Sequence, residues 1–295
     1  MTEPDQPAAP PTYVLTLDCP DRAGIMHAVT RVLVEQHGNI LESQQFSDQA
    51  ENRFFMRVRY AVDSAEPGST LLEPLRVAFA PVAERFEMTW ELWEATAPYR
   101  TLILVSKFSH CLNDLLFRWS KAALQIDIVG IVSNHLDCEG FAESYGVPYH
   151  HIPVTPETKA RAEAEMLALV DSLGVDLVVL ARYMQVLSDD TCRALAGRAI
   201  NIHHSFLPSF KGARPYHQAF DRGVKLVGAT AHYVTADLDE GPIIEQDLMR
   251  VDHRYGAAEL AAAGRDVESQ VLSRAVRWHA ESRVLLNGHK TVVFR

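Results

Sequence analysis

The sequence lacks the patterns that mark disulfide-bonded proteins, metalloproteins and membrane proteins. Its four cysteines are far apart and form no C-x-x-C pair, which favours free thiols in a reducing cytoplasm. Its thirteen histidines include no H-E-x-x-H or comparable ligand spacing, so we expect no bound metal. No apolar run approaches the length of a membrane span, and we therefore expect a cytoplasmic globular protein without membrane contact.

Positive charge is also scarce. The 28 lysine and arginine residues are outnumbered by 38 aspartate and glutamate residues, which gives a formal net charge of -10. Broad contact with nucleic acid needs clustered basic residues, so we expect no nucleic-acid partner, whereas a small anionic substrate needs only a local basic patch. Residues 1–11 are acidic and proline-rich, unlike a secretory signal, and are expected to form a disordered tail.

A first domain is predicted over residues 12–95, with the element order β-α-β-β-α-β. Apolar residues recur at helical spacing from Ile25, and Asp21 stands where a capping side chain would begin that helix. A second helix is expected to be kinked at Pro81. This order of elements predicts a ferredoxin-like fold.

Residues 96–100 are expected to be a linker, and residues 101–295 a second domain. There, near-continuous apolar strands alternate with amphipathic helices. This alternation indicates an α/β fold with a doubly wound, mostly parallel sheet. The last elements are predicted as a helix over 265–286 and a strand over 290–294.

The stretch from Ala199 to Gln246 carries the residue types that acyl chemistry needs. Asn201 and His203 stand two residues apart at the end of a predicted strand, so their side chains share one face. His204 is then expected to point to the opposite face and to be structural. An amide can donate hydrogen bonds to a developing oxyanion, an imidazole can carry a proton, and the carboxylate of Asp239 can orient that imidazole or a water. Taken singly, each of these residues would more often be a turn former or an ordinary buried residue.

The same stretch resembles the signature of the formyl transferases that use formyltetrahydrofolate. The matching elements are Asn201-Ile202-His203, Ser205-x-Leu207-Pro208, Gly212, His232-Tyr233-Val234-Thr235 and Leu238-Asp239-x-Gly241-Pro242. This resemblance implies that Asn201, His203 and Asp239 are the catalytic residues. It also implies that 10-formyltetrahydrofolate is the substrate and that no separate cofactor is needed.

The segment from Leu180 to Ser188 resembles the pterin-binding loop of that family. An apolar rim with exposed backbone amides suits a flat heterocycle rich in donors and acceptors. The resemblance implies that Met184, Val186 and Leu187 line the pocket and that the backbone of Gln185 and Leu187 binds the pterin edge. The other expected folate contacts are Ile202, His232 and Val234. The alternative is that these are ordinary core residues.

The first domain resembles ACT domains through the pattern Asp-x-Pro-Asp-Arg-x-Gly before its first helix. This resemblance implies a regulatory module that binds an amino acid. Because Gly24 lets a ligand approach backbone amides, the expected effector site is Asp21, Arg22, Ala23, Gly24 and Ile25. The alternative is a module that only builds an oligomer interface, and a homo-oligomer is expected in either case.

Water is the expected acceptor of the formyl group. Residues 105–112 contain no glycine, whereas the glycinamide ribonucleotide transformylases carry a glycine-rich phosphate cradle there. Bulky Lys107, Phe108 and His110 would obstruct such a cradle. We also expect no additional C-terminal domain of the kind with which methionyl-tRNA formyltransferases hold tRNA.

The family resemblance therefore implies hydrolysis of 10-formyltetrahydrofolate to tetrahydrofolate and formate. Such a reaction would balance one-carbon folate pools and supply formate for purine synthesis. Two alternatives stay open: formyl transfer to an amine such as glycinamide ribonucleotide, and a non-catalytic protein that senses folate or an amino acid.

Overall fold

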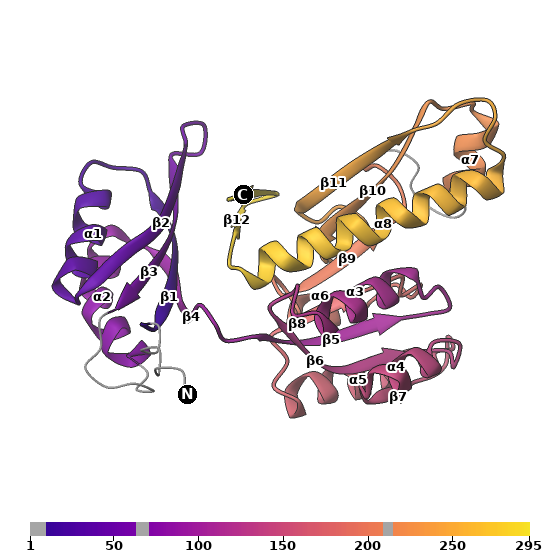
Figure 1. Cartoon of the computed structure of the whole chain (residues 1–295), viewed down its shortest axis with the longest axis horizontal. Coiled ribbons are helices and arrows are strands. Elements are labelled where there is room, and N and C mark those ends of the chain that lie inside the picture. Colours follow the sequence, from indigo (N-terminus) through magenta and orange to yellow (C-terminus); the bar gives the residue numbers. More distant parts are fainter. Residues whose placement is uncertain (1–9, 63–70, 209–214) are drawn as a thin grey trace, which may run out of the picture. The chain divides into compact units, whose positions relative to one another are not determined.

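The computed structural model describes residues 10–62, 71–208 and 215–295. Its contacts divide the chain into two compact units, each with its own sheet and helices (Figure 1). The first unit is Met1–Ala97 with Glu281–Leu285 and Val292–Arg295, and the second is Pro98–Ala280 with Leu286–Thr291. The first division lies within the expected linker, although its last two residues, Tyr99 and Arg100, already belong to a strand.

The first unit is built on a four-stranded antiparallel sheet in the order β2-β3-β1-β4. Apolar side chains from the sheet and from two helices form its core. Its elements are β1 (Thr12–Pro20), α1 (Ile25–Glu35), β2 (Gly38–Asp48), β3 (Arg53–Val62), α2 (Leu72–Phe86) and β4 (Thr89–Glu94). The predicted ferredoxin-like order is confirmed.

The beginning of α1 differs from the prediction. Asp21 does not cap the helix; the capping position is occupied by Gly24, whose φ is 93°, and no side chain bonds to the helix end. A left-handed backbone conformation costs glycine least, so Gly24 determines where this helix begins. Helix α2 runs through Pro81 as one element.

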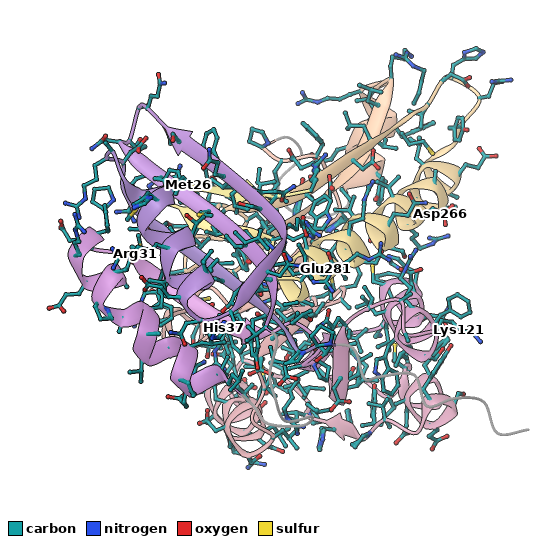
Figure 2. The ribbon with its side chains drawn as sticks, turned by 60° about the vertical axis from the view of Figure 1, so that its left-hand side comes forward. Met26, Arg31, His37, Lys121, Asp266 and Glu281 are labelled. Atoms are coloured by element: carbon teal, nitrogen blue, oxygen red, sulfur yellow. The ribbon has the colours of Figure 1, made fainter. Side chains whose placement is uncertain are left out.

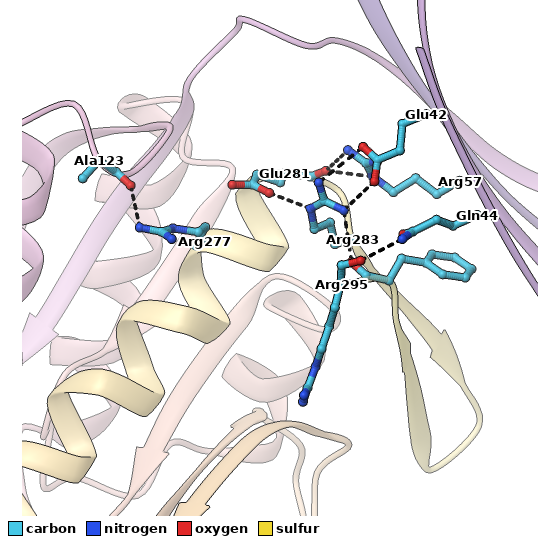
Figure 3. Close-up of polar contacts among 9 residues, drawn as sticks. Glu42, Gln44, Arg57, Ala123, Arg277, Glu281, Arg283 and Arg295 are labelled. Carbon is cyan, nitrogen blue, oxygen red and sulfur yellow. Dashed lines mark hydrogen bonds and ion pairs between the residues drawn. The ribbon is translucent and has the colours of Figure 1, made fainter. Parts of the chain in front are cut away.

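The last residues of the chain pack within the first unit, which the predicted boundary at 101–295 does not include. Arg57 on β3 is 2% exposed, and its guanidinium donates to a Glu42 carboxylate oxygen at 3.0 Å and to the Glu281 carbonyl at 3.0 and 3.1 Å (Figure 3). Arg283 also donates to Glu42, at 2.9 Å. These charge-assisted hydrogen bonds hold the C-terminal segments against β2 and β3.

The second unit contains a seven-stranded sheet in the order β11-β10-β9-β8-β5-β6-β7. The strands β7, β6, β5, β8 and β9 are parallel, and β10 and β11 are antiparallel at one edge. This confirms the predicted mostly parallel α/β sheet. The strands are β5 (Tyr99–Val105), β6 (Ile126–Ser133), β7 (Tyr149–His151), β8 (Leu177–Leu180), β9 (Ala199–His203), β10 (Leu226–Tyr233) and β11 (Ile243–Arg250).

Six helices accompany this sheet in the described residues. They are α3 (His110–Ser120), α4 (Glu139–Tyr145), α5 (Lys159–Ser172), α6 (Asp189–Ala194), α7 (Pro215–Asp221) and α8 (Ala257–Ala280). Helix α8 begins and ends earlier than predicted, and two short strands follow it, β12 (Val284–Asn287) and β13 (Lys290–Val293). None of the helices in the described part of the chain is long and apolar enough to cross a membrane.

The order of strands reverses beside β5. From β5 the chain adds β6 and β7 on one side, and then adds β8 and β9 on the other. Open α/β sheets bind ligands beyond the carboxyl ends of the strands at such a reversal. The strands β8 and β9 end at Leu180 and His203, so both sequence motifs begin at this edge.

Helix α8 presents different side chains to solvent and to the protein interior. Asp266 is exposed on α8 (Figure 2), whereas Glu268 is 1% exposed. Residues two positions apart lie on roughly opposite sides of a helix. A carboxylate is thereby directed into the second unit.

Candidate active site

A cleft of about 590 Å³ lies in the second unit at the carboxyl ends of β8 and β9. Both sequence motifs and helix α8 contribute to its lining. The predicted residues that line it are Asn201, His203, Asp239, Met184, Gln185, Val186, Leu187, Ile202, His232 and Val234. The fold thus brings together every described residue that the sequence predicts for catalysis and folate binding; Gly212 lies outside the described residues.

Pairing between β9 and β10 places the amide of Asn201. Asn201 lies directly opposite His232 in this antiparallel pair, and His203 lies opposite Thr230. Residues that face each other in this way have side chains on one side of the sheet. Asn201 Nδ2 is consequently 3.2 Å from His232 Nε2.

The ring of His232 fixes the orientation of that amide. His232 Nδ1 lies 2.9 Å from the Tyr233 carbonyl oxygen, which can only accept, so Nδ1 carries the proton. Burial lowers the pKa of His232, and the neutral ring therefore accepts a hydrogen bond from Asn201 through Nε2. The amide keeps its second N–H for another acceptor.

A tight turn between β10 and β11 places Asp239. Its φ of 58° is left-handed, a conformation that few residues other than glycine, asparagine and aspartate adopt. Gly241 lies so close to Tyr233 that a Cβ there would be 1.7 Å from the Tyr233 carbonyl oxygen. The turn sets Asp239 Oδ2 3.2 Å from His203 Nδ1 and Oδ1 3.8 Å from His232 Nε2.

His203 has one ring nitrogen bound to the protein and one that is not. Nδ1 donates to Asp239, and Nε2 has no hydrogen-bond partner among the described residues. Burial raises the pKa of Asp239, but the hydrogen bond and charge of His203 outweigh this effect and leave that pKa below its usual value. Asp239 is therefore ionised at neutral pH and holds His203 with Nε2 able to accept a proton.

His204 also lines the cleft, contrary to the prediction that it points away. Strand β9 ends at His203, so the alternation of an extended chain does not continue to the next residue. The ring centroids of His203 and His204 are 5.1 Å apart. Burial, with the charges of Arg182 and His203, lowers the pKa of His204 to about 3, and its ring is neutral at physiological pH.

The predicted pterin loop is anchored at both ends. The backbone N–H of Met184 donates to Ser106 Oγ at 2.9 Å, and the backbone N–H of Ser188 donates to the Glu163 carboxylate at 3.1 Å. Between these anchors Met184 and Val186 are 52% and 55% exposed. A loop that is fixed at both ends by hydrogen bonds and exposes apolar side chains loses little conformational entropy when it binds a flat ring.

The cleft also contains a hydrogen-bonded cluster of polar side chains around Glu268, which was not predicted from the sequence. Glu268 accepts from Tyr216 Oη at 2.6 Å, and its other oxygen is 2.8 Å from His110 Nε2 and 3.5 Å from Arg182 Nε. Burial raises the pKa of Glu268, but these partners outweigh it and leave that pKa lowered. Arg182 lies within the predicted pterin loop, but nothing in the sequence singles it out. Its distinguishing feature is the burial of its side chain, which a single sequence does not reveal.

One cluster of side chains that could together bind a metal ion occurs among the described residues. Atoms of His110, Cys111 and Glu268 lie within 4.8 Å of one another. Burial raises the pKa of the Cys111 thiol, and a protonated thiol is a poor ligand. His110 and Glu268 are also hydrogen-bonded to each other, so a hydrogen-bonded cluster describes this group better than a metal site.

The predicted effector residues lie in the first unit at the beginning of α1. The backbone N–H of Asp21 donates to the Asn52 carbonyl, and Arg22 donates to the Arg85 carbonyl at 2.7 Å. Both contacts hold the loop around Gly24. Effector binding here stays a prediction.

Comparison with known proteins identifies both parts of the chain. A family model described as formyl transferase matches residues 99–276, and one described as ACT domain matches residues 13–75. A formyltetrahydrofolate deformylase from Corynebacterium sp. (strain P-1) is 56% identical over 96% of this chain and 98% of its own length. That from Escherichia coli (strain K12) is 40% identical over 95% of this chain and 97% of its own.

Solved structures give the same picture. The crystal structure of formyltetrahydrofolate deformylase from Burkholderia mallei has a TM-score of 0.92 and 52% identity, covering 97% of this chain and all of that one. Glycinamide ribonucleotide transformylase 1 from Symbiobacterium toebii has a TM-score of 0.64 and 29% identity. It covers 70% of this chain and 98% of its own, so the likeness to the transformylase extends over a smaller part of the molecule.

Proposed function

The chain belongs to the formyltetrahydrofolate deformylase family, and on that premise we propose that its cleft hydrolyses 10-formyltetrahydrofolate to tetrahydrofolate and formate. The observation that carries this proposal is the Asp239–His203 pair beside the oriented amide of Asn201, with His203 Nε2 lacking a partner in the described part of the chain. These groups supply a proton acceptor and an oxyanion donor without a nucleophilic side chain. Water is then the attacking group.

In the proposed mechanism, His203 Nε2 accepts a proton from water as the water oxygen attacks the formyl carbon. The free N–H of Asn201 stabilises the oxyanion that forms. Collapse of this intermediate breaks the bond from carbon to the folate nitrogen, which takes the proton from His203. The carboxylic acid product loses its remaining proton and becomes formate. Asp239 holds the tautomer of His203 and stabilises the ring while it carries the extra proton.

Residues 106–110 support water over a larger acceptor. The Phe108 ring lies beneath the Arg182 guanidinium, 5.3 Å from the guanidinium carbon to the ring centroid, and His110 is bonded to Glu268. The side chains of Phe108 and His110 are therefore engaged in contacts within the protein. A phosphate cradle formed by backbone amides needs small residues at these positions.

Incubation of the purified full chain with 10-formyltetrahydrofolate and no amine tests the proposal. We expect tetrahydrofolate and formate to appear in equal amounts, and added glycinamide ribonucleotide to leave the formate yield unchanged. Formyl transfer to the amine with little formate would favour the transferase alternative. Tight folate binding with no turnover would favour a non-catalytic sensor.

Regulation and assembly are separate proposals. We propose that the ACT unit binds an amino acid beside Gly24 and that the protein works as a homo-oligomer. Calorimetric titration of the full chain with each amino acid tests the first, and light scattering of the full chain tests the second. Absence of heat for every amino acid would leave the unit a purely structural one.

A further inference from the structure

Arg182 is a buried cation for which the proposed hydrolysis has no role. It is 9% exposed and lines the same cleft as Asn201 and His203. Neither its Nε nor its Nη1 has a hydrogen-bond partner among the described residues. Its φ of 66° is left-handed. An incompletely paired buried charge and a strained backbone both cost free energy, and such costs are concentrated where ligands bind.

The neighbours of Arg182 fix its position but leave its Nε and Nη1 donors without a hydrogen-bond partner among the described residues. The guanidinium lies over the Phe108 ring, and its Nε is 3.5 Å from Glu268 Oε2. Each Glu268 oxygen is already engaged, one by Tyr216 and one by His110. Glu268 thus balances the charge of Arg182, while the Nη1 donor is buried and has no partner among the described residues.

The proposed reaction creates an anion beside another anion. Asp239 is ionised, and formate would form within reach of the groups that Asp239 orients. A carboxylate product next to a carboxylate side chain needs a cation to bind it. Two arginines line the cleft, and Arg182 is buried whereas Arg265 is exposed.

We propose that Arg182 is the main contact of a subsite for a small carboxylate and that this subsite receives formate after the carbon–nitrogen bond breaks. The identity of the anion rests on the proposed hydrolysis, whereas the subsite itself rests on the geometry of Arg182. A guanidinium donates to planar carboxylates through well-directed hydrogen bonds. The neighbouring Glu268 carboxylate weakens the attraction, which suits a product that has to leave.

Titration of ¹³C-labelled formate with the full-chain protein, followed by the formate NMR line width, tests the subsite. We expect saturable broadening with the unaltered protein, and an affinity at least about tenfold lower for Arg182→Gln, because the charge-assisted hydrogen bonds are lost. Arg182→Gly removes the same group, and glycine suits a left-handed φ, so its fold should persist. Arg193→Gln makes the same charge change on an exposed arginine of α6 and should bind formate normally.

Equal formate affinity in a folded Arg182→Gly variant would overturn the subsite. The subsite would also be overturned if chloride displaced formate as effectively as acetate does, because a carboxylate site should prefer acetate to chloride. Asn201→Ala separates the two proposals, since it should bind formate normally while it hydrolyses substrate about 10²- to 10³-fold more slowly. If the unaltered protein shows no hydrolysis but formate binding depends on Arg182, the proposed function fails and the anion subsite stands.

Discussion

At the residue scale, two histidines in the cleft share the same tautomer but differ in the hydrogen bonding of their second ring nitrogen. His203 and His232 both carry a proton on Nδ1, one donating to Asp239 and the other to the Tyr233 carbonyl. The second nitrogen of His232 is taken by Asn201, whereas that of His203 has no partner among the described residues. His203 is therefore the ring that can carry a proton, and His232 is the ring that positions the amide.

Asn201→Ala should lower kcat for formate release about 10²- to 10³-fold, because one oxyanion donor is lost. The KM for 10-formyltetrahydrofolate should change little, since the pterin loop is untouched. Steady-state kinetics measure both. Asn113→Ala, an exposed position on α3, should behave like the unaltered protein. A loss smaller than tenfold in kcat would contradict the role assigned to Asn201.

The lowered pKa of His204 predicts a dependence of stability on pH. A neutral histidine in the folded protein gains a proton on unfolding below its usual pKa of 6.5, so stability is full above that pH and falls as the pH drops toward about 3. In His204→Gln the decline should be smaller by up to about 1.4 kcal/mol per pH unit. Denaturant unfolding at a series of pH values checks this, with exposed His253→Gln as the control. Identical slopes for the His204 and His253 variants would contradict burial of a neutral ring.

At the element scale, the turn between β10 and β11 links the geometry of the sheet to the position of Asp239 in the cleft. Tyr233 at the end of β10 accepts from His232 and, through its N–H, is bonded to the Pro242 carbonyl. Gly241 fits against the same residue. The turn that carries Asp239 and the strand that carries His232 are thus fixed by one set of backbone contacts.

Gly241→Ala should disrupt this arrangement, because its Cβ would meet the Tyr233 carbonyl oxygen at 1.7 Å. Relief of the clash requires the turn to move and Asp239 to leave His203. We expect a loss of activity exceeding tenfold and a loss of about 1–3 kcal/mol in unfolding free energy. Activity assays and denaturant unfolding measure the two effects.

Gly140→Ala is the matched control for that substitution. Gly140 lies exposed on α4 with no atom within 4 Å of an added Cβ. Alanine there should stabilise the protein by about 0.5–1 kcal/mol through its higher helix propensity. Near-normal activity of Gly241→Ala would show that the turn tolerates movement without displacing Asp239.

At the scale of the whole molecule, the first unit contains residues from both ends of the chain. Arg57 and Glu42 from the β2–β3 pair bond to Glu281 and Arg283, which follow α8 directly in sequence. The chain therefore enters the second unit at Pro98, returns to the first after Ala280, and contributes residues 286–291 to the second unit before it ends in the first. Removal of the C-terminal segments would leave polar groups of β2 and β3 without their hydrogen-bond partners. The buried Arg57, for example, would lose the Glu281 carbonyl.

Arg57→Met should release the C-terminal segments from the first unit. Methionine keeps the apolar length of the side chain but loses three hydrogen bonds. We expect amide hydrogen exchange at least about tenfold faster in residues 281–285 and 292–295, with little change in β9 of the second unit. Mass spectrometry of deuterated peptides measures this. Arg31→Met, an exposed arginine on α1, should leave all exchange rates unchanged.

The sequence by itself determined the division into a ferredoxin-like and an α/β part, the order of most elements, and the presence of Asn201, His203 and Asp239 in one cleft. Periodicity and strand ends are local properties, and this is why Asn201 and His203 could be placed on one face of a strand. The capping of α1 and the bounds of α8 were wrong because backbone conformation at Gly24 and packing after Ala280 depend on distant residues.

Only the tertiary structure decided which groups act on one another. The register of β9 with β10 sets Asn201 against His232, and a left-handed turn sets Asp239 against His203. The burial of Arg182 and Glu268 arises from α8 meeting the loop after β8, far apart in sequence. Contact, burial and charge pairing follow from the packing of separate elements, which a residue pattern along one chain does not contain.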